Sequence, residues 1–141
     1  MSIKVVIVGA GGLVGARMID ALVSMSHFGT GGSEALPLAK IVLFDMRDIT
    51  ADLTATQSAD SRVRCVAGDL TERATLDSLF DPDGCTRVTV IQLAAVLSGY
   101  AESNFELGMK VCTSRQPAAA RKAVLGARWP IRCLSADVRG V

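Results

Sequence analysis

The hydrophobic residues of this chain fall into short runs separated by more polar segments. The first run, Ile3–Val8, is rich in β-branched residues and does not alternate between apolar and polar positions. Such a run is typical of a central strand in a parallel sheet, buried on both faces. Further strands are predicted at 39–44, 62–67 and 87–93, helices at 16–23 and 71–80, and a short helix or loop at 49–57.

A glycine-rich turn joins the first strand to the first helix, with the sequence Gly-Ala-Gly-Gly-Leu-Val-Gly over residues 9–15. Gly9 allows a sharp turn, Gly12 has no side chain to keep a pyrophosphate from the backbone, and Gly15 lets the helix pack close to the strand. The helix N-terminus adds unpaired N–H groups and a positive dipole end. The turn predicts a dinucleotide site, although a tight turn without a ligand is the alternative. The predicted contacts are Gly9, Gly11, Gly12, Leu13, Val14 and Gly15.

Strands that alternate with helices predict an α/β protein, a Rossmann-type three-layer sandwich around a parallel sheet. Right-handed crossovers give the strand order 3-2-1-4, with a ligand crevice between strands one and four. The length of 141 residues fits one domain, and a composition of 50% hydrophobic but only 4% aromatic residues indicates an aliphatic core. The segment 27–38 is polar and glycine-rich, so it is predicted to be a long connection with His27 as a polar helix-end residue.

Asp45 ends the predicted second strand. An acidic residue at this place accepts hydrogen bonds from the adenosine ribose hydroxyls, and its charge repels a 2′-phosphate. Asp45 therefore favours NAD over NADP, although Arg47, two residues later, could accommodate a 2′-phosphate. The alternative is that Asp45 only caps the following turn, as its neighbour Asp48 could also do.

Two other strand ends carry candidate contacts. Asp69 follows the third predicted strand and could cap the next helix, with Glu72 completing a pair like a capping box. The fourth predicted strand ends in Leu93, Ala94 and Ala95. Small residues there allow the backbone to approach the pyrophosphate and the nicotinamide ribose of a dinucleotide.

Charge and cysteine content limit the possible partners. Fifteen Lys and Arg against 14 Asp and Glu leave a formal charge of +1, which gives no electrostatic argument for nucleic acid or an anionic membrane. The apolar N-terminal run is interrupted by glycines, unlike a signal peptide or membrane span, so a cytoplasmic protein is expected. Four cysteines without a C-x-x-C pair and a single histidine offer no zinc site, and free thiols and no bound metal are predicted.

Several ordered segments together resemble one family. They are Ile7–Gly15, Val42–Asp45, Gly68–Leu70, Leu93–Gly99 and Ala101–Met109. From residue 2 to about Val111 the chain resembles the extended short-chain dehydrogenases, in the NAD-dependent epimerase/dehydratase family and its D-erythronate dehydrogenase-like branch. Gln92 departs from the usual histidine. The resemblance implies NAD as cofactor and adds an adenine contact at Asp69 with Leu70.

The resemblance also implies hydride transfer between NAD and a small polar hydroxy substrate, such as a sugar acid or a compound like a nucleotide sugar. The family uses a tyrosine base with a lysine four residues later. The only tyrosine here is Tyr100, and position 104 is Asn104, so the chain contains no Tyr-x-x-x-Lys pair. Tyr100 and Ser98 are therefore expected at most to line the substrate site, and no residue is predicted to be catalytic.

The resemblance ends near Val111. Two parts are thus predicted: an NAD-binding half-domain at 1–111 and an atypical tail at 112–141, in which Pro117 interrupts an expected helix. We hypothesise a shift of reading frame near residue 112; the alternative is a divergent tail with a helix at 118–124 and a weak strand at 131–134. The sheet is then expected to be truncated after four to five strands. An apolar, unpaired edge on the fourth strand would favour self-association.

Three functional interpretations follow from the sequence. The chain is the NAD-binding portion of an oxidoreductase, a non-catalytic dinucleotide-binding module, or an inactive truncated product. The glycine turn and Asp45 favour the first two interpretations.

Overall fold

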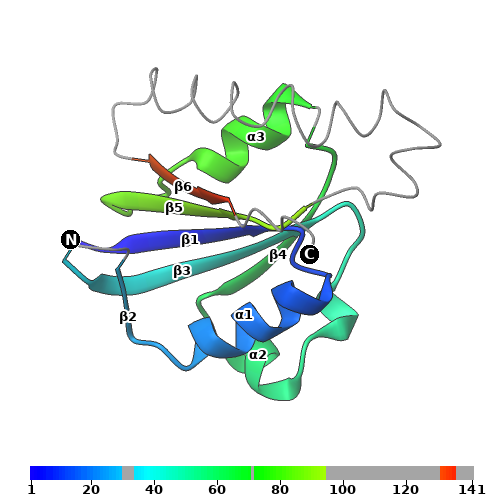
Figure 1. Cartoon of the computed structure of the whole chain (residues 1–141), viewed down its shortest axis with the longest axis horizontal. Helices are drawn as coiled ribbons and strands as arrows, with labels where there is room; N and C mark the ends of the chain where they lie inside the picture. Colours follow the sequence, from blue (N-terminus) through cyan, green and yellow to red (C-terminus); the bar gives the residue numbers. More distant parts are fainter. Residues whose placement is uncertain (30–33, 71, 95–130, 136–141) are drawn as a thin grey trace, which may run out of the picture.

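The computed structural model describes residues 1–29, 34–70 and 72–94, together with the backbone of 131–135 (Figure 1). These residues form one sheet with helices on both of its faces (Figure 1). The strands are β1 (Ile3–Val8), β2 (His27–Phe28), β3 (Leu36–Asp45), β4 (Val63–Ala67), β5 (Arg87–Gln92) and β6 (Ile131–Ser135). The helices are α1 (Leu13–Val23), the 3-10 helix η1 (Thr50–Asp52), α2 (Ala55–Ala59) and α3 (Arg73–Phe80).

The five longer strands are parallel and lie in the order β4-β3-β1-β5-β6. The predicted order 3-2-1-4 corresponds to β4, β3, β1 and β5, so the prediction is confirmed, as is the α/β Rossmann-type fold. The central strand β1 pairs with β3 on one side and β5 on the other over its whole length. Its carboxyl end therefore lies between two neighbours, which is where the sequence places the glycine turn.

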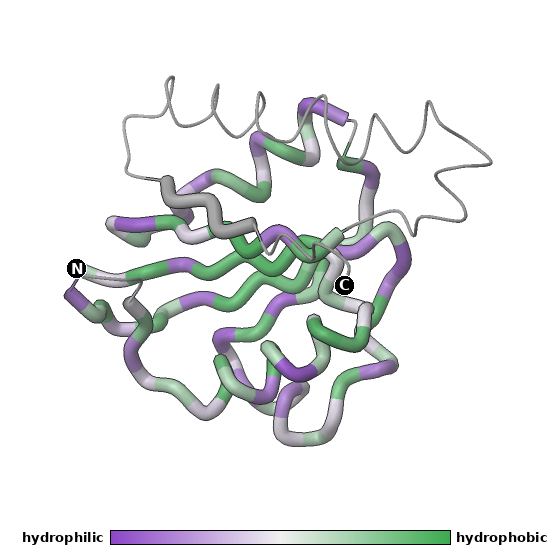
Figure 2. Tube along the Cα trace, viewed as in Figure 1, coloured by the Kyte–Doolittle hydropathy of each residue, from purple (hydrophilic) through white to green (hydrophobic). Residues whose placement is uncertain are grey.

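The core has two layers, one on each face of the sheet. Alternate residues of β1 contribute to both layers, because successive side chains of a strand point to opposite faces. On one face, Ile19 and Leu22 of α1 pack against Val5 and Ile7. On the other face, Leu79 of α3 packs in a cluster whose further members are Val6, Val8, Val42, Phe44, Val88 and Val90. Figure 2 shows hydrophobic colouring along the central strands.

The strand β3 begins earlier than predicted. Leu36 and Leu38 are buried and Pro37 between them is exposed, so the alternation of a strand starts inside the segment predicted to be a connection. Proline has no N–H group, and it is tolerated here because this end of β3 pairs only with the two-residue antiparallel strand β2. His27 lies in β2, three residues beyond the C-cap of α1 at Ser24, so the prediction of a helix-end residue is wrong.

Both predicted helices differ from the structure at their first residues. The helix α1 begins at Leu13, inside the glycine turn, rather than at residue 16. The helix α3 begins at Arg73 with Glu72 as its N-cap, so the capping pair predicted for Asp69 and Glu72 is wrong. The physical reason is a turn before the helix: the Glu72 N–H donates to the Asp69 carbonyl at 3.1 Å, which places Asp69 outside the helix.

The edge of β5 is paired with another strand, which differs from the expectation. The sequence analysis expected an apolar, unpaired edge on this strand, but β6 pairs with it in parallel, with Val88 opposite Ile131 and Gln92 opposite Ser135. That expectation is therefore wrong, and the tail contributes a fifth parallel strand. The helix predicted at 118–124 lies outside the described residues.

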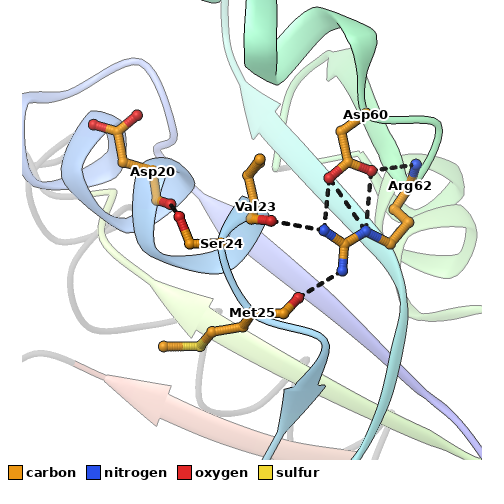
Figure 3. A network of polar contacts seen from close by, with 6 residues as sticks. All are labelled: Asp20, Val23, Ser24, Met25, Asp60 and Arg62. Atoms are coloured by element: carbon orange, nitrogen blue, oxygen red, sulfur yellow. Dashed lines mark hydrogen bonds and ion pairs between the residues drawn. The ribbon is translucent and has the colours of Figure 1, made fainter.

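The C-terminal end of α1 is fastened to the strand β4 by Arg62 (Figure 3). The Arg62 guanidinium donates to the carbonyls of Val23 at 2.8 Å and Met25 at 2.6 Å. It also forms an ion pair with Asp60 at 2.6 Å, and this pair is largely buried. Arginine thereby satisfies carbonyl groups that have no partner within the helix. The orientation of α1 is fixed at the end opposite the glycine turn.

Candidate functional site

The candidate site lies at the carboxyl ends of β1, β3 and β5, where the glycine turn leaves β1. The N–H groups of Gly9 and Ala10 donate to the Phe44 carbonyl at 2.9 and 3.1 Å. From the other side, the N–H groups of Leu93 and Ala94 donate to the Val8 carbonyl at 2.8 and 2.9 Å. The start of the turn is thus hydrogen-bonded to the ends of both neighbouring strands and has a fixed position.

Two of the glycines are required by the protein itself. Gly9 has φ +85°, and a Cβ atom there would lie 2.6 Å from the Ala94 nitrogen. A Cβ atom on Gly15 would lie 2.3 Å from the Ala10 carbonyl oxygen. Both distances are to backbone atoms, which cannot give way. The predicted sharp turn at Gly9 is therefore confirmed, and α1 approaches the turn at Gly15 as closely as the glycine allows.

Gly12 differs from these two because none of the residues that the structure describes requires a glycine there. It is exposed, its φ of −83° suits any residue, and among the described residues a Cβ atom would meet only the Gly9 carbonyl oxygen at 3.6 Å. The space that a side chain would fill lies beside the first turn of α1. A glycine at this position leaves room for a group to approach the backbone from solvent.

Within the part of the chain that the structure describes, the N-terminus of α1 carries no side-chain cap. Its N-cap residue is Gly12, which has no side chain to accept a hydrogen bond, and the first turn contains no acidic residue. The N–H groups of Leu13, Val14 and Gly15 are the first-turn donors that have no acceptor within a helix. Leu13 is 83% exposed and Val14 56% exposed, so this turn faces solvent. Such an arrangement attracts an anionic group such as a phosphate.

Asp45 lies against this turn. Its Oδ2 atom accepts a hydrogen bond from the Gly11 N–H at 2.8 Å, and its Oδ1 atom accepts one from the Met46 N–H at 2.8 Å. The second contact is the turn-capping role that the sequence left open. Each carboxylate oxygen has a further lone pair, so Asp45 can still accept hydrogen bonds from a ligand. Its role toward a ribose stays a prediction.

This carboxylate gives a reason within the protein for a glycine at position 11, and the role of Gly11 toward a ligand stays a prediction. A Cβ atom on Gly11 would lie 2.9 Å from the Asp45 Oδ2 atom and 3.0 Å from Cγ2 of Ile49. Ile49 is 2% exposed and belongs to the core cluster on the α1 face. The sequence analysis missed Ile49; its signal was a β-branched apolar residue between polar neighbours in the segment after Asp45.

Segment 68–70 also lies next to Asp45, because the Gly68 N–H donates to the Asp45 carbonyl at 3.1 Å. Within it, Asp69 is exposed, whereas Leu70 is partly buried against the core cluster on the α3 face. Leu70 therefore packs in the core, and a role in adenine binding stays a prediction for both residues.

The other predicted contacts fall into two groups. Leu93 and Ala94 lie at the end of β5, partly buried, with their N–H groups on the Val8 carbonyl. Ala95, Ser98 and Tyr100 lie outside the described residues.

The charged residues after β3 form their own contacts. Asp48 accepts hydrogen bonds from the Thr50 hydroxyl at 2.6 Å and the Thr50 N–H at 2.9 Å, and these bonds lower the pKa of the Asp48 carboxyl. Asp48 thereby closes the turn that leads into η1, the turn-capping role that the sequence analysis considered for Asp48 beside Asp45. Arg47 forms an ion pair with Asp52 at 2.6 Å.

Metal ligation and membrane insertion were also considered for the part of the chain that the structure describes. No group of three or more His, Cys, Asp and Glu residues gathers there in a way that could hold a metal ion. Within the same residues, no helix has the length and apolar character needed to cross a membrane. Cys65 and Cys85 are free thiols, and burial raises the pKa of the Cys65 thiol.

The chain was also compared with known proteins. No family model matches the chain. A D-erythronate dehydrogenase of Cupriavidus necator is 34% identical over 109 residues, which are 77% of this chain and 30% of that protein. This chain therefore spans less than a third of the length of that relative.

Solved structures share the fold. The nucleoside-diphosphate-sugar epimerase of Agrobacterium tumefaciens superposes with a TM-score of 0.69 at 24% identity, covering 95% of this chain and 36% of that one. A GalE-like L-threonine dehydrogenase of Cupriavidus necator, in its holo form, superposes with a TM-score of 0.58 at 18% identity, covering 91% and 35%. The predicted resemblance to the extended short-chain dehydrogenases, in the D-erythronate dehydrogenase-like branch, is confirmed for the part matched.

Proposed function

We propose that this chain binds NAD through residues 1–111, as the N-terminal portion of an extended short-chain dehydrogenase. The observation that carries this proposal is the clear space at Gly12 beside the uncapped first turn of α1. A pyrophosphate placed there would meet N–H donors that have no acceptor within the helix, and among the described residues no side chain would stand in its way.

Asp45 supports NAD as the dinucleotide. Its carboxylate is held at the glycine turn by the Gly11 N–H and keeps acceptor capacity for ribose hydroxyls. A 2′-phosphate at the same place would meet a negative charge within a few ångströms. The residues that would hold the cofactor are the turn from Gly9 to Gly15, Asp45, Asp69 with Leu70, and the strand end from Leu93 to Ala95.

The proposed reaction of the whole enzyme is oxidation of a hydroxyl group on a sugar acid or a compound like a nucleotide sugar. NAD, when bound, accepts the hydride from the substrate carbon. The substrate class is inferred from the similar D-erythronate dehydrogenase, which is named for a sugar acid. In this chain Ser98 and Tyr100 are the candidates to contact substrate.

A non-catalytic role is the second candidate, either as a dinucleotide-binding module or as an inactive product. The observation that favours it is the lone tyrosine, Tyr100, which is followed at the fourth position by Asn104 rather than lysine. Without a lysine nearby, a tyrosine hydroxyl stays protonated at neutral pH and is a poor general base. Binding of NAD without turnover of 2-hydroxy or sugar acids would support this second candidate.

A substitution at Gly12 tests the proposed site. Titration calorimetry with NAD on the wild-type chain and on Gly12→Val is expected to show a loss of affinity of at least about 100-fold, or about 2.7 kcal/mol. Because the added side chain meets little of the protein, the melting temperature should change little. Ala21→Val, which adds the same group at an exposed position of α1, is the matched control. Unchanged affinity in Gly12→Val would rule out the assigned site.

A further inference from the structure

The segment that follows Asp45 is held in place beside the glycine turn. Ile49 is buried in the core cluster and approaches Gly11, and the Asp52 N–H donates to the Ile49 carbonyl at 3.0 Å. Asp48 fixes the start of η1 through its two hydrogen bonds to Thr50. The side chains that this segment presents to solvent therefore have a defined position relative to Asp45.

Arg47 and Asp52 are two such side chains. The Arg47 Nη2 atom lies 2.6 Å from the Asp52 Oδ2 atom, with the side chains 59% and 53% exposed. The pair joins the residue two positions after Asp45 to the last residue of η1. In the described part of the chain, no other ion pair involves Arg47. Asp52 thus neutralises the cation nearest in sequence to Asp45.

This pairing bears on the choice between the two dinucleotides. An arginine near the end of this strand is the kind of residue that accommodates a 2′-phosphate, which NADP has and NAD lacks. A phosphate recruits arginine through paired, charge-assisted hydrogen bonds. To do so here, it would have to displace the Asp52 carboxylate and also approach Asp45.

We propose that Asp52 is a positioning residue for cofactor selectivity: by pairing with Arg47 it withholds the guanidinium from a 2′-phosphate and so favours NAD over NADP. This inference depends on the proposed function, since it concerns the same dinucleotide site. Asp45 is the main determinant, because its charge acts on the phosphate directly. Asp52 adds a smaller contribution, because the ion pair is exposed and such pairs are weak.

The test compares the affinities of NAD and NADP by titration calorimetry at low salt. Asp52→Asn keeps the shape of the side chain and removes its charge. It is expected to increase the affinity for NADP about two- to fivefold and to leave the affinity for NAD unchanged. The gain should shrink at high salt, because the contact is between exposed charges.

The double variant Asp52→Asn with Arg47→Gln is the control. If the gain acts through Arg47, the double variant loses it; if the double variant keeps the gain, Asp52 acts only as a general negative charge and the inference is overturned. An Asp52→Asn protein that binds NAD normally but shows no gain for NADP also overturns it. A wild-type chain that binds neither dinucleotide overturns the proposed function itself, and this inference with it.

Discussion

The two ends of helix α1 are treated in opposite ways. At the C-terminal end, the Arg62 guanidinium reaches across from the start of β4 and satisfies two carbonyl groups, and Asp60 neutralises its charge (Figure 3). At the N-terminal end, a glycine is the N-cap, no side chain of the described residues caps the first turn, and that turn is exposed. The difference teaches that a candidate ligand site in this fold can be recognised by helix donors for which the described residues supply no acceptor.

The amino and carboxyl ends of the parallel strands show the same difference. At the amino ends of the strands, Lys4 is only 3% exposed and donates to the Asp81 carbonyl at 2.8 Å, while Lys40 pairs with Asp83. Burial lowers the pKa of Lys4, and the hydrogen bond from Lys40 lowers the pKa of Asp83. These charges have partners within the protein, so they are structural. At the carboxyl ends of the strands, the glycine turn faces solvent, and the described residues leave open space beside Gly12.

Gly15→Ala should have the largest effect on stability, since it acts where α1 meets the turn. The new Cβ atom would lie 2.3 Å from the Ala10 carbonyl oxygen, so the helix or the turn must move. We expect a loss of at least about 3 kcal/mol in the free energy of unfolding, measured by urea denaturation.

Gly12→Ala is the matched control for this substitution. It adds the same methyl group three residues earlier, where only one protein atom lies within contact distance. Its cost should not exceed about 1 kcal/mol, the scale of an alanine at an N-cap. Equal losses for the two variants would contradict the distinction between a glycine required by the protein and one kept clear for a ligand.

Arg62→Ala should have the next largest effect, because it removes the cap from the other end of α1. It leaves the largely buried Asp60 carboxylate without its partner and the Val23 and Met25 carbonyls without their donor. We expect a loss of about 2–3 kcal/mol in the free energy of unfolding. The affinity for NAD of the folded variant should stay the same, because the proposed dinucleotide site is at the far end of the helix.

Arg62→Lys separates charge from geometry in this prediction. A lysine keeps the positive charge, but its single ammonium group cannot bind Asp60 and both carbonyls in the planar arrangement that arginine provides. Lysine should therefore recover less than half of the lost stability. Full recovery would show that charge alone matters at this end of the helix.

The fold could be predicted in large part because burial leaves a direct mark on the sequence. Strands buried on both faces are continuous apolar runs, and the crossover rule then orders them correctly. The prediction was wrong where local chemistry and tertiary contacts disagree. The polar, glycine-rich composition of 27–38 indicated a connection, yet its last residues begin β3, where Leu36 and Pro37 pair with the two-residue strand β2.

The position of the candidate site could be predicted from the sequence, but the contacts among its residues could not. Glycine spacing indicates the turn, and strand position indicates Asp45, because both depend on local sequence. The hydrogen bond from Gly11 to Asp45 and the ion pair between Arg47 and Asp52 depend on how segments pack after folding. No periodicity encodes them. The contacts of Gly11 with the Asp45 carboxylate and Ile49 could therefore not be predicted, while its role toward a ligand stays a prediction.

The smallest predicted effect is a pH dependence of the unfolding free energy that comes from the C-terminal end of α1, where Arg62 pairs with Asp60. Hydrogen bonds from the Arg62 side chain lower the pKa of Asp60 below its ordinary value. Because the ionised form is favoured in the folded state, the pair stabilises the protein above the unfolded pKa of about 3.9 and is lost as the pH falls through the lower folded pKa. Asp60→Asn removes this contribution, so the difference in unfolding free energy between wild type and variant should be about 1 kcal/mol near pH 6 and shrink toward pH 3.

Asp77→Asn provides the comparison for this pH dependence. Asp77 pairs with Arg73 within α3, with side chains 66% and 77% exposed, and an exposed pair of this kind contributes little. Urea denaturation at pH 6, 4 and 3 should therefore give nearly parallel curves for wild type and Asp77→Asn, but converging curves for wild type and Asp60→Asn. Parallel curves for Asp60→Asn would mean that Arg62 holds α1 through the helix carbonyls alone. The contacts at the C-terminal end of α1 would then be insensitive to acid, because neither the guanidinium nor the carbonyls titrate in this range. Asp60 would serve only to orient the arginine.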